Sequence, residues 1–174
     1  LNHCRSVLEI GSGTGQHAVY FAAKLPQLVW QCSDLEENHA GIRQWLDQAA
    51  LPNTPAPLLL DVTLHDMSAL NFDAVYSANT IHFMCRDAVR SMVHGVGKVL
   101  PKGGLLILYG PFNYGNRYTS DSNARFDEWL KQRDPMSGIR NFEDVDKLAN
   151  DAQLTLHQDV AMPANNRIIS WRKY

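Results

Sequence analysis

Three glycines alternate with other residues near the start of the chain, at Gly11, Gly13 and Gly15. An apolar run at 6–10 precedes them, and a segment with helical spacing of apolar residues, 15–25, follows. Glycines at such a junction allow a sharp turn and let the backbone approach a ligand closely, while the N-terminus of the helix offers free N–H groups. The pattern therefore predicts a ligand-binding loop rather than a plain tight turn.

The spacing of these glycines distinguishes between classes of ligand loop. The dinucleotide fingerprint G-x-G-x-x-G would place its third glycine at position 16, where this chain has Gln16. A P-loop would require Gly-Lys-Ser or Gly-Lys-Thr, which does not follow. The pattern present is G-x-G-x-G, with Glu9 two positions before its first glycine. A nicotinamide-dependent oxidoreductase is kept as a less favoured alternative, because such enzymes share the alternating sheet and an acidic residue for the ribose.

Acidic residues stand at the ends of the next two predicted strands, at Asp34 and Asp61. The carboxyl ends of parallel strands face one crevice, so these side chains are expected near the glycine loop. A carboxylate at Asp34 can accept hydrogen bonds from both hydroxyls of a ribose, and Asp61 can accept one from an amino group such as adenine N6. Each aspartate alone could be a solvated turn residue. Together with the loop they indicate a nucleoside site.

The elements that must position these residues alternate between strand and helix. Strands are predicted at 6–10, 28–33, 57–62, 72–77 and 105–109, and helices at 15–25, 36–50 and 86–100. Two further helical patterns follow a polar loop at 111–122, and strands at 154–161 and 167–173 are joined by a hairpin connection. A parallel sheet covered on both faces and closed by an antiparallel hairpin is expected. No repeat or linker interrupts the pattern, so residues 1–174 are expected to form a single domain.

Composition restricts the class of partner. The 174 residues include 16 basic and 18 acidic side chains, a net charge of −2, which argues against nucleic-acid and anionic-membrane partners because both require a basic face. No apolar stretch approaches the roughly 20 residues of a membrane span, and the first residues do not resemble a signal peptide. Cys4, Cys32 and Cys85 lack metal-ligand spacing, so reduced thiols, a cytoplasmic location and no metal site are expected.

These features together resemble the class I S-adenosylmethionine (SAM)-dependent methyltransferases. The resemblance rests on Leu8-Glu9-Ile10-Gly11-Ser12-Gly13-Thr14-Gly15, Asp34, Asp61 and Phe72-Asp73-Ala74-Val75, and the element lengths match over essentially the whole chain. Finer motifs are similar to the methyltransferase-like 26 family, namely Gly15-Gln16-His17-Ala18, Tyr109-Gly110-Pro111-Phe112-Asn113, Arg133-Asp134-Pro135, Gly138-Ile139-Arg140 and Met162-Pro163-Ala164-Asn165-Asn166. The resemblance implies a Rossmann-like α/β fold with a mostly parallel seven-stranded sheet, an antiparallel last strand and helices on both faces.

The resemblance also implies SAM as the cofactor and S-adenosylhomocysteine as its product. It assigns cofactor contacts to Glu9, Gly11, Ser12, Gly13, Gly15, Asp34, Leu35, Asp61, Val62 and Asn79. Glu9 would face the methionine end, and Asn79 would lie near the methionine portion. Asp34 would hold the ribose hydroxyls with Leu35 under the adenine, while Asp61 and Val62 would face the adenine edge and ring. Family members carry a helical segment before the first strand, so the natural chain is expected to begin earlier.

Methyl transfer is an in-line displacement in which the cofactor carries the electrophile, so the protein mainly positions the acceptor and excludes water. A base is needed only when the nucleophile arrives protonated, and His82, just past the strand at 72–77, is the candidate. Packing or capping beneath the following helix is an equally good interpretation of His82. Whether a base is used at all is left open.

Polar and aromatic residues beyond the later strand ends are candidates for binding the acceptor. Tyr109, Asn113 and Tyr114, with Tyr118 beyond them, stand where a substrate wall or lid would lie, although some could simply pack the loop. Asn165 and Asn166 stand in the predicted hairpin connection at the same face, where asparagine is also an ordinary turn residue.

The acceptor class is approached by elimination. The segment 77–82 lacks the Pro-Pro-aromatic run of methyltransferases that act on exocyclic amines of nucleic acids, and the chain has no Pro-Cys pair for attack on a pyrimidine. No carboxylate cluster would obviously hold magnesium beside a catechol. A small-molecule acceptor is therefore expected, with protein side chains left open. The alternative is a catalytically silent scaffold of methyltransferase type that acts through a protein partner.

Overall fold

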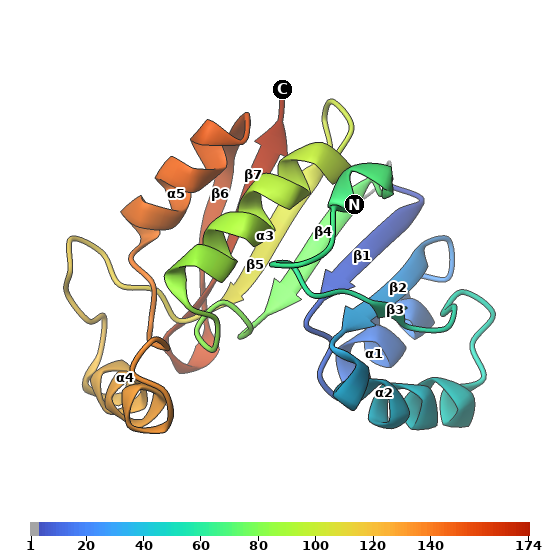
Figure 1. The fold of residues 1–174 in the computed structure, drawn as a ribbon, viewed down its shortest axis with the longest axis horizontal. Helices are drawn as coiled ribbons and strands as arrows, with labels where there is room; N and C mark the ends of the chain where they lie inside the picture. The colour runs from blue at the N-terminus through green and yellow to red at the C-terminus, as the bar shows by residue number, and fades with distance from the viewer. Residues whose placement is uncertain (1–3) are drawn as a thin grey trace.

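The computed structural model describes residues 4–174, and within them the strands form one seven-stranded sheet (Figure 1). The strands are β1 (Ser6–Ile10), β2 (Val29–Asp34), β3 (Leu58–Leu59), β4 (Ala74–Ala78), β5 (Leu105–Gly110), β6 (Leu154–Met162) and β7 (Asn166–Lys173). Their order is β3-β2-β1-β4-β5-β7-β6. The neighbouring pairs among β1 to β5 are parallel, whereas β7 is antiparallel to both β5 and β6. The predicted fold class, including the antiparallel last strand, is confirmed.

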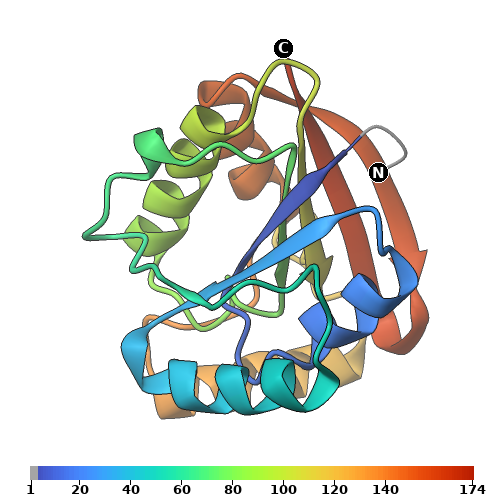
Figure 2. The ribbon, with the colours of Figure 1, turned by 90° about the vertical axis from the view of Figure 1, so that its right-hand side faces the viewer.

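Helices lie on both faces of this sheet and at one of its edges. They are α1 (Gln16–Lys24), α2 (Glu36–Ala49), α3 (Arg86–Val99), α4 (Asp121–Arg133) and α5 (Phe142–Asp151), with single 3-10 turns η1 (Met67–Ala69) and η2 (Pro163–Asn165). Figure 2 shows α3 and α5 on one side of the sheet and α1 on the other. In Figure 1, α4 and the turn between β6 and β7 lie at the edge where β1, β4 and β5 end, here called the carboxyl edge.

The sequence pattern explains how α3 is held against the sheet. Met92, Val93 and Val96 recur at helical spacing and are fully buried. They belong to the same core cluster as Leu106 and Leu108, which alternate along β5 and point to the α3 face. Burial of an aliphatic side chain of this size stabilises a fold by roughly 1.5–3 kcal/mol. The packing of α3 on the sheet therefore fixes the position of β5, which ends at the carboxyl edge.

The third strand is much shorter than the sequence pattern predicts. A strand was expected over 57–62, but β3 pairs only with Ser33 and Asp34 of β2, at the outer edge of the sheet. The chain then bends away, because the carbonyl of Asp61 accepts from the N–H groups of Leu64 and His65. An edge strand has one partner for its hydrogen bonds, so a tight turn displaces it readily. The turn leaves Asp61 at the carboxyl edge.

Cys4, Cys32 and Cys85 are free thiols, and Cys32 is buried among apolar side chains. Between residues 4 and 174, no helix is long and apolar enough to cross a membrane. Within the same range, no three His, Cys, Asp or Glu side chains are grouped to hold a metal ion. The cytoplasmic location stays a prediction. The helical segment expected ahead of β1, and with it the start of the chain at residues 1–3, lies outside the described residues.

Candidate functional site

The glycine loop joins β1 to α1 at the carboxyl edge. The N–H groups of Gly11 and Ser12 donate to the carbonyl of Ser33 at 3.0 and 3.1 Å, which ties the loop to the end of β2. Gly13 has a φ of +59°, a left-handed conformation that favours glycine, and nothing lies within 4 Å of the position a Cβ would take. A ligand can therefore approach the backbone at Gly13 directly.

Asp34 ends β2 and is bonded to this loop. Its Oδ2 accepts from the N–H of Gly13 at 2.7 Å, and its Oδ1 accepts from the N–H of Leu35 and from Asn38 Nδ2 at 2.7 and 2.8 Å. A carboxylate has about four lone-pair sites, so these bonds leave roughly one unfilled. Asp34 can accept one ligand hydroxyl as it stands. A second hydroxyl requires it to release one of its present donors, such as Gly13.

The predicted adenine-side residues lie on the neighbouring strand ends. Asp34 and the turn after β3 are joined by a hydrogen bond of 3.0 Å from the N–H of Leu60 to the Asp34 carbonyl. Oδ1 of Asp61 accepts from the backbone and hydroxyl of Thr63 at 2.8 and 2.6 Å, and these bonds lower the pKa of Asp61. Val62 is buried, whereas Leu35 is partly exposed at the start of α2. The Asp61 carboxylate is therefore charged and keeps Oδ2 for a further partner.

Glu9 lies within β1 and is 1% exposed. Its Oε2 accepts from Trp30 Nε1 at 3.0 Å, and its Oε1 is 3.9 Å from His17 Nδ1 on α1. Burial raises the pKa of Glu9 to about 7, although the hydrogen bond from Trp30 opposes this shift. The carboxyl therefore exists in both protonation states near neutral pH. Any ligand contact would come through Oε1, on the side of the half-exposed His17.

A tight turn after β4 joins the glycine loop to the rest of the carboxyl edge. Asn79 has a φ of +55°, and its N–H donates to the carbonyl of Tyr109 at 2.8 Å. The next residue, Thr80, packs against the loop so closely that a Cβ on Gly11 would lie 2.4 Å from its Cγ2. The two consecutive residues therefore contact the glycine loop on one side and the end of β5 on the other.

A cavity of about 510 Å³ opens beside this turn, within the range of about 300–1,000 Å³ typical of small-molecule sites. It is called the α4 cavity here, and its lining residues are Asn79, Phe83, Pro111, Ser122, Asn123, Phe126, Ala164, Asn165 and Asn166. They come from the turns after β4 and β5, from α4 and from the β6–β7 hairpin, which Figure 1 shows converging at the carboxyl edge. The structure thus brings the predicted residues Asn79, Asn165 and Asn166 together.

Hydrogen bonds hold the hairpin wall of the α4 cavity. Asn165 Nδ2 donates to Ser122 Oγ at 3.2 Å, and the Asn165 carbonyl accepts from Asn123 Nδ2 at 3.2 Å. Asn166 Nδ2 donates to the hydroxyl of Tyr109 at 3.0 Å. Tyr109 therefore supports the cavity wall through Asn166 without lining the cavity itself.

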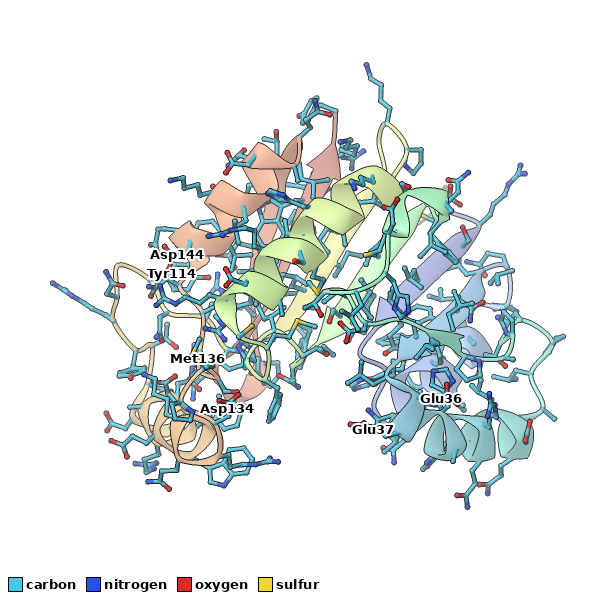
Figure 3. The ribbon with its side chains drawn as sticks, in the orientation of Figure 1. Glu36, Glu37, Tyr114, Asp134, Met136 and Asp144 are labelled. Atoms are coloured by element: carbon cyan, nitrogen blue, oxygen red, sulfur yellow. The ribbon has the colours of Figure 1, made fainter. Side chains whose placement is uncertain are left out.

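Asn113 and Tyr114 do not line the α4 cavity. The Tyr114 hydroxyl donates to Asp159 Oδ2 at 2.7 Å, and its ring stacks on Phe142 with centroids 5.4 Å apart. Figure 3 shows Tyr114 at the end of the molecule where α5 begins, which agrees with its contact to Phe142. Asn113 is buried, and its backbone pairs with the segment leading into α5. Their predicted place on a substrate wall stays a prediction, and in this structure both residues attach the loop after β5 to α5 and β6.

His82 lies behind the α4 cavity and is 0% exposed. Neither ring nitrogen has a hydrogen-bond partner among the described residues, and Nε2 lies 2.6 Å from the position of a Cβ on Gly110. Burial, aided by the charge of Arg140, lowers the pKa of His82 to about 3, so the ring is neutral near pH 7. A general base must come within hydrogen-bonding reach of the proton it takes, directly or through water. The base role of His82 stays a prediction, and the ring packs beside the cavity wall here.

Sequence reasoning missed three aromatic residues beside the α4 cavity. They are Phe83, Phe126 and Trp129. Trp129 is 45% exposed and stacks on Phe126 with centroids 5.9 Å apart. The buried face of α4 instead carries Asn123, Asp127 and Leu130. These residues recur at i, i+4 and i+7. The polar pair Asn123 and Asp127 in line with Leu130 is the signal that could have revealed that the aromatic residues face outward.

Residues 1–173 match the sequence profile of the family described as "Protein of unknown function (DUF938)". The chain belongs to this family. The DUF938 chain is also similar to solved structures, at identities that show the fold alone. An O-methyltransferase family protein from Burkholderia thailandensis has a TM-score of 0.89 and 15% identity over 99% of this chain and 52% of its own. An O-methyltransferase family 2 protein from Planctomyces limnophilus, in complex with apigenin, has a TM-score of 0.86 and 16% identity over 98% and 51%.

The mitomycin 7-O-methyltransferase MmcR is similar too, with a TM-score of 0.85 and 14% identity over 98% of this chain and 49% of its own. The DUF938 chain therefore spans about half the length of the solved proteins it matches. The shared half is the Rossmann-like sheet with its carboxyl edge.

Proposed function

We propose that residues 1–174 act as a single SAM-dependent methyltransferase domain whose acceptor is a small molecule. The observation that carries the proposal is the pairing of two sites across Asn79 and Thr80. The glycine loop with Asp34 and Asp61 lies on one side of these residues, and the α4 cavity lies on the other. An in-line transfer needs a donor site and an acceptor site in contact. The names of the similar structures, which include two small molecules, support the same class.

The residues of the loop fit the proposed cofactor. The open space at Gly13 admits a ligand against the backbone, and Asp34 keeps an acceptor site toward a ribose hydroxyl. Leu35 offers exposed apolar surface to an adenine ring, buried Val62 lies at the neighbouring strand end, and Asp61 offers Oδ2 to the adenine edge. The rest of the proposed cofactor site would be formed by Gly11, Ser12, Gly15 and Asn79. Glu9 would face the methionine end of the cofactor. Bound SAM would supply the methyl group as a sulfonium, while the chain binds, orients and excludes water.

Within DUF938, we assign the chain to the methyltransferase-like 26 branch. This assignment rests on the motifs at 109–113, 133–135 and 162–166. All three lie around the α4 cavity or on the elements that support it. A branch defined by such motifs would share an acceptor class.

Calorimetric titration with SAM, S-adenosylhomocysteine and NAD tests the proposal. Asp34→Asn keeps the size of the side chain but removes its charge, and a hydrogen bond to a charged group contributes about 1.5–3 kcal/mol. We expect the variant to bind S-adenosylhomocysteine about 10- to 100-fold more weakly. Asp47→Asn is the matched control, because Asp47 is an exposed carboxylate on α2, and it should bind like the wild type.

A second candidate function is the scaffold that acts through a protein partner. It is favoured by the bond from Gly13 to Asp34, which already occupies part of the predicted ribose site. A folded chain that gives no heat with SAM or S-adenosylhomocysteine would support the scaffold. Heat with NAD alone would support the oxidoreductase instead.

A further inference from the structure

The walls of the α4 cavity carry no ionisable side chain among the residues that the structure describes. The polar part of the lining consists of four asparagines and one serine, and Phe83 and Phe126 are among its apolar residues. Amide side chains donate and accept hydrogen bonds but take up no proton near neutral pH. The cavity can therefore orient an acceptor, but its walls hold no group that could act as a general base.

Aromatic faces stand beside this uncharged lining. The aromatic rim, as it is called here, consists of Phe83, Phe126 and Trp129. The rings of Phe126 and Trp129 stack with centroids 5.9 Å apart, and Phe83 meets Trp129 edge to face with centroids 6.4 Å apart. The Arg133 guanidinium lies 4.8 Å from the Trp129 ring. Single exposed apolar residues need no explanation, but Phe83 (46% exposed) and Trp129 form a contiguous patch at a cavity. Phe83 and Phe126 line the cavity and offer aromatic surface to a planar ring, while Trp129 packs against both of them from outside the lining.

The titratable groups nearest to the lining are separated from the cavity or already paired. Tyr109 lies behind Asn166, and His82 lies behind Asn79 and Gly110 with no exposed surface. Asp127 on α4 is buried and bonded by Tyr118, Lys131 and the N–H of Ile139. Arg133, the charged group on the aromatic rim, is a donor only. None of these four groups lines the cavity in this structure.

We propose that the acceptor is a phenol or thiophenol that has a planar ring and ionises in water near neutral pH. It stacks on the aromatic rim and reacts as its anion. The inference rests on the proposed methyltransferase function. The acceptor loses its O–H or S–H proton to solvent before transfer. The lone pair of the anion then forms the bond to the methyl carbon, and the carbon–sulfur bond of the sulfonium breaks with its electron pair on sulfur. The products are an aryl methyl ether or thioether and S-adenosylhomocysteine.

A matched pair of acceptors tests the chemistry with the full chain and labelled SAM. 4-Nitrophenol ionises near neutral pH, whereas phenol, like tyrosine, ionises at about pH 10. We expect methylation of 4-nitrophenol at pH 7 and about 10- to 100-fold slower methylation of phenol, because the smaller anion fraction of phenol outweighs the greater nucleophilicity of its anion. The rate with phenol should rise about tenfold per pH unit up to its own pKa, because the anion fraction rises in that proportion. The pKa seen in kcat/KM would thus belong to the acceptor.

The opposite result would be one pKa shared by both acceptors. If that pKa also disappears in His82→Asn or in Tyr109→Phe, a protein base is present and the inference is overturned. Two variants are used because His82 is fully buried and its replacement can unfold the chain. Binding of S-adenosylhomocysteine without transfer to either acceptor would overturn the acceptor class while the proposed function stands. Absence of that binding in a folded chain would overturn both.

Binding gives an independent readout at the aromatic rim. Trp129→Leu and Phe126→Leu should weaken binding of 4-nitrophenol about 2- to 10-fold, since an aromatic pair contributes roughly 0.5–1.5 kcal/mol. Quenching of tryptophan fluorescence by 4-nitrophenol should also fall in Trp129→Leu. Trp45→Leu is the matched control, because Trp45 is similarly exposed but lies on α2. Equal losses in the two tryptophan variants would contradict stacking at the rim.

Discussion

The buried carboxyl of Glu9 couples the charge of one residue to the stability of the whole chain. Burial raises its pKa from 4.5 to about 7, and Trp30, Ser12 and the nearby charge of Asp34 modify this shift. The folded chain therefore holds the proton more tightly than the unfolded chain does. By linkage, the contribution of Glu9 to the free energy of unfolding is complete below about pH 4.5 and is lost as the pH rises to about 7. At about 1.4 kcal/mol per pKa unit, the rise from 4.5 to about 7 corresponds to a loss of about 3.5 kcal/mol.

Glu9→Gln tests this linkage, because glutamine still accepts the hydrogen bond from Trp30 but cannot ionise. The free energy of unfolding of the variant and of the wild type is measured in urea at pH 5 and at pH 8. The difference between variant and wild type should shift by about 2–3 kcal/mol in favour of the variant from pH 5 to pH 8. The groups that face Glu9 are His17, Cys32 and Tyr76, and they are present in both proteins. Glu37→Gln, an exposed change on α2, should show no such gain. Parallel pH dependences for Glu9→Gln and the wild type would contradict the linkage.

At the scale of elements, α4 is anchored by a buried carboxylate as well as by apolar packing. Asp127 accepts from the Tyr118 hydroxyl at 2.7 Å, from the N–H of Ile139 at 2.6 Å and from Lys131 Nζ. The first two donors come from the loops on either side of α4. Burial raises the pKa of Asp127, but the hydrogen bonds, led by the one from Lys131, outweigh it and hold the pKa below its usual value. The position of one wall of the α4 cavity therefore depends on this side chain.

Asp127→Ala should destabilise the chain by about 2–3 kcal/mol, because hydrogen bonds to a charged group contribute about 1.5–3 kcal/mol and the buried N–H of Ile139 loses its partner. Amide hydrogen exchange should accelerate most in α4, through local opening of this helix, while exchange in α3 should accelerate only by the global destabilisation. Asp121→Ala, at an exposed position in the first turn of the same helix, is the control. Uniform acceleration across α3 and α4 would mean that Asp127 supports the whole fold rather than α4.

At the scale of the whole molecule, the sequence predicted the sheet better than it predicted the loops at the carboxyl edge. Alternating apolar runs report directly on strands and helices buried between layers, so β1, β4, β5 and α3 agree closely with their predicted ranges. The arrangement of those loops depends on where they fold back onto other elements, which local spacing does not encode. Tyr114 therefore pairs with Asp159, 45 residues away, rather than facing the cavity.

The two sides of the molecule meet at Gly11 and Thr80, and this contact can be measured. A Cβ at Gly11 would lie 2.4 Å from Thr80 Cγ2, whereas a Cβ at Gly13 would meet nothing within 4 Å. Both glycines have positive φ, so alanine at either position carries a backbone cost of about 1–2 kcal/mol. Gly11→Ala should cost a further 1–3 kcal/mol, roughly, from overpacking.

Thr80→Ala should relieve that extra cost, because it removes the two Thr80 atoms nearest to the added methyl group. In a double-mutant cycle, the coupling between Gly11→Ala and Thr80→Ala should be about 1–2 kcal/mol and favourable, and that between Gly13→Ala and Thr80→Ala close to zero. Gly13→Ala should instead weaken binding of S-adenosylhomocysteine with little further loss of stability, because its methyl group enters the open space of the loop. Normal binding of S-adenosylhomocysteine by the Gly13 variant would mean that the ligand does not contact this loop. Zero coupling at Gly11 would mean that Thr80 does not restrict the glycine loop.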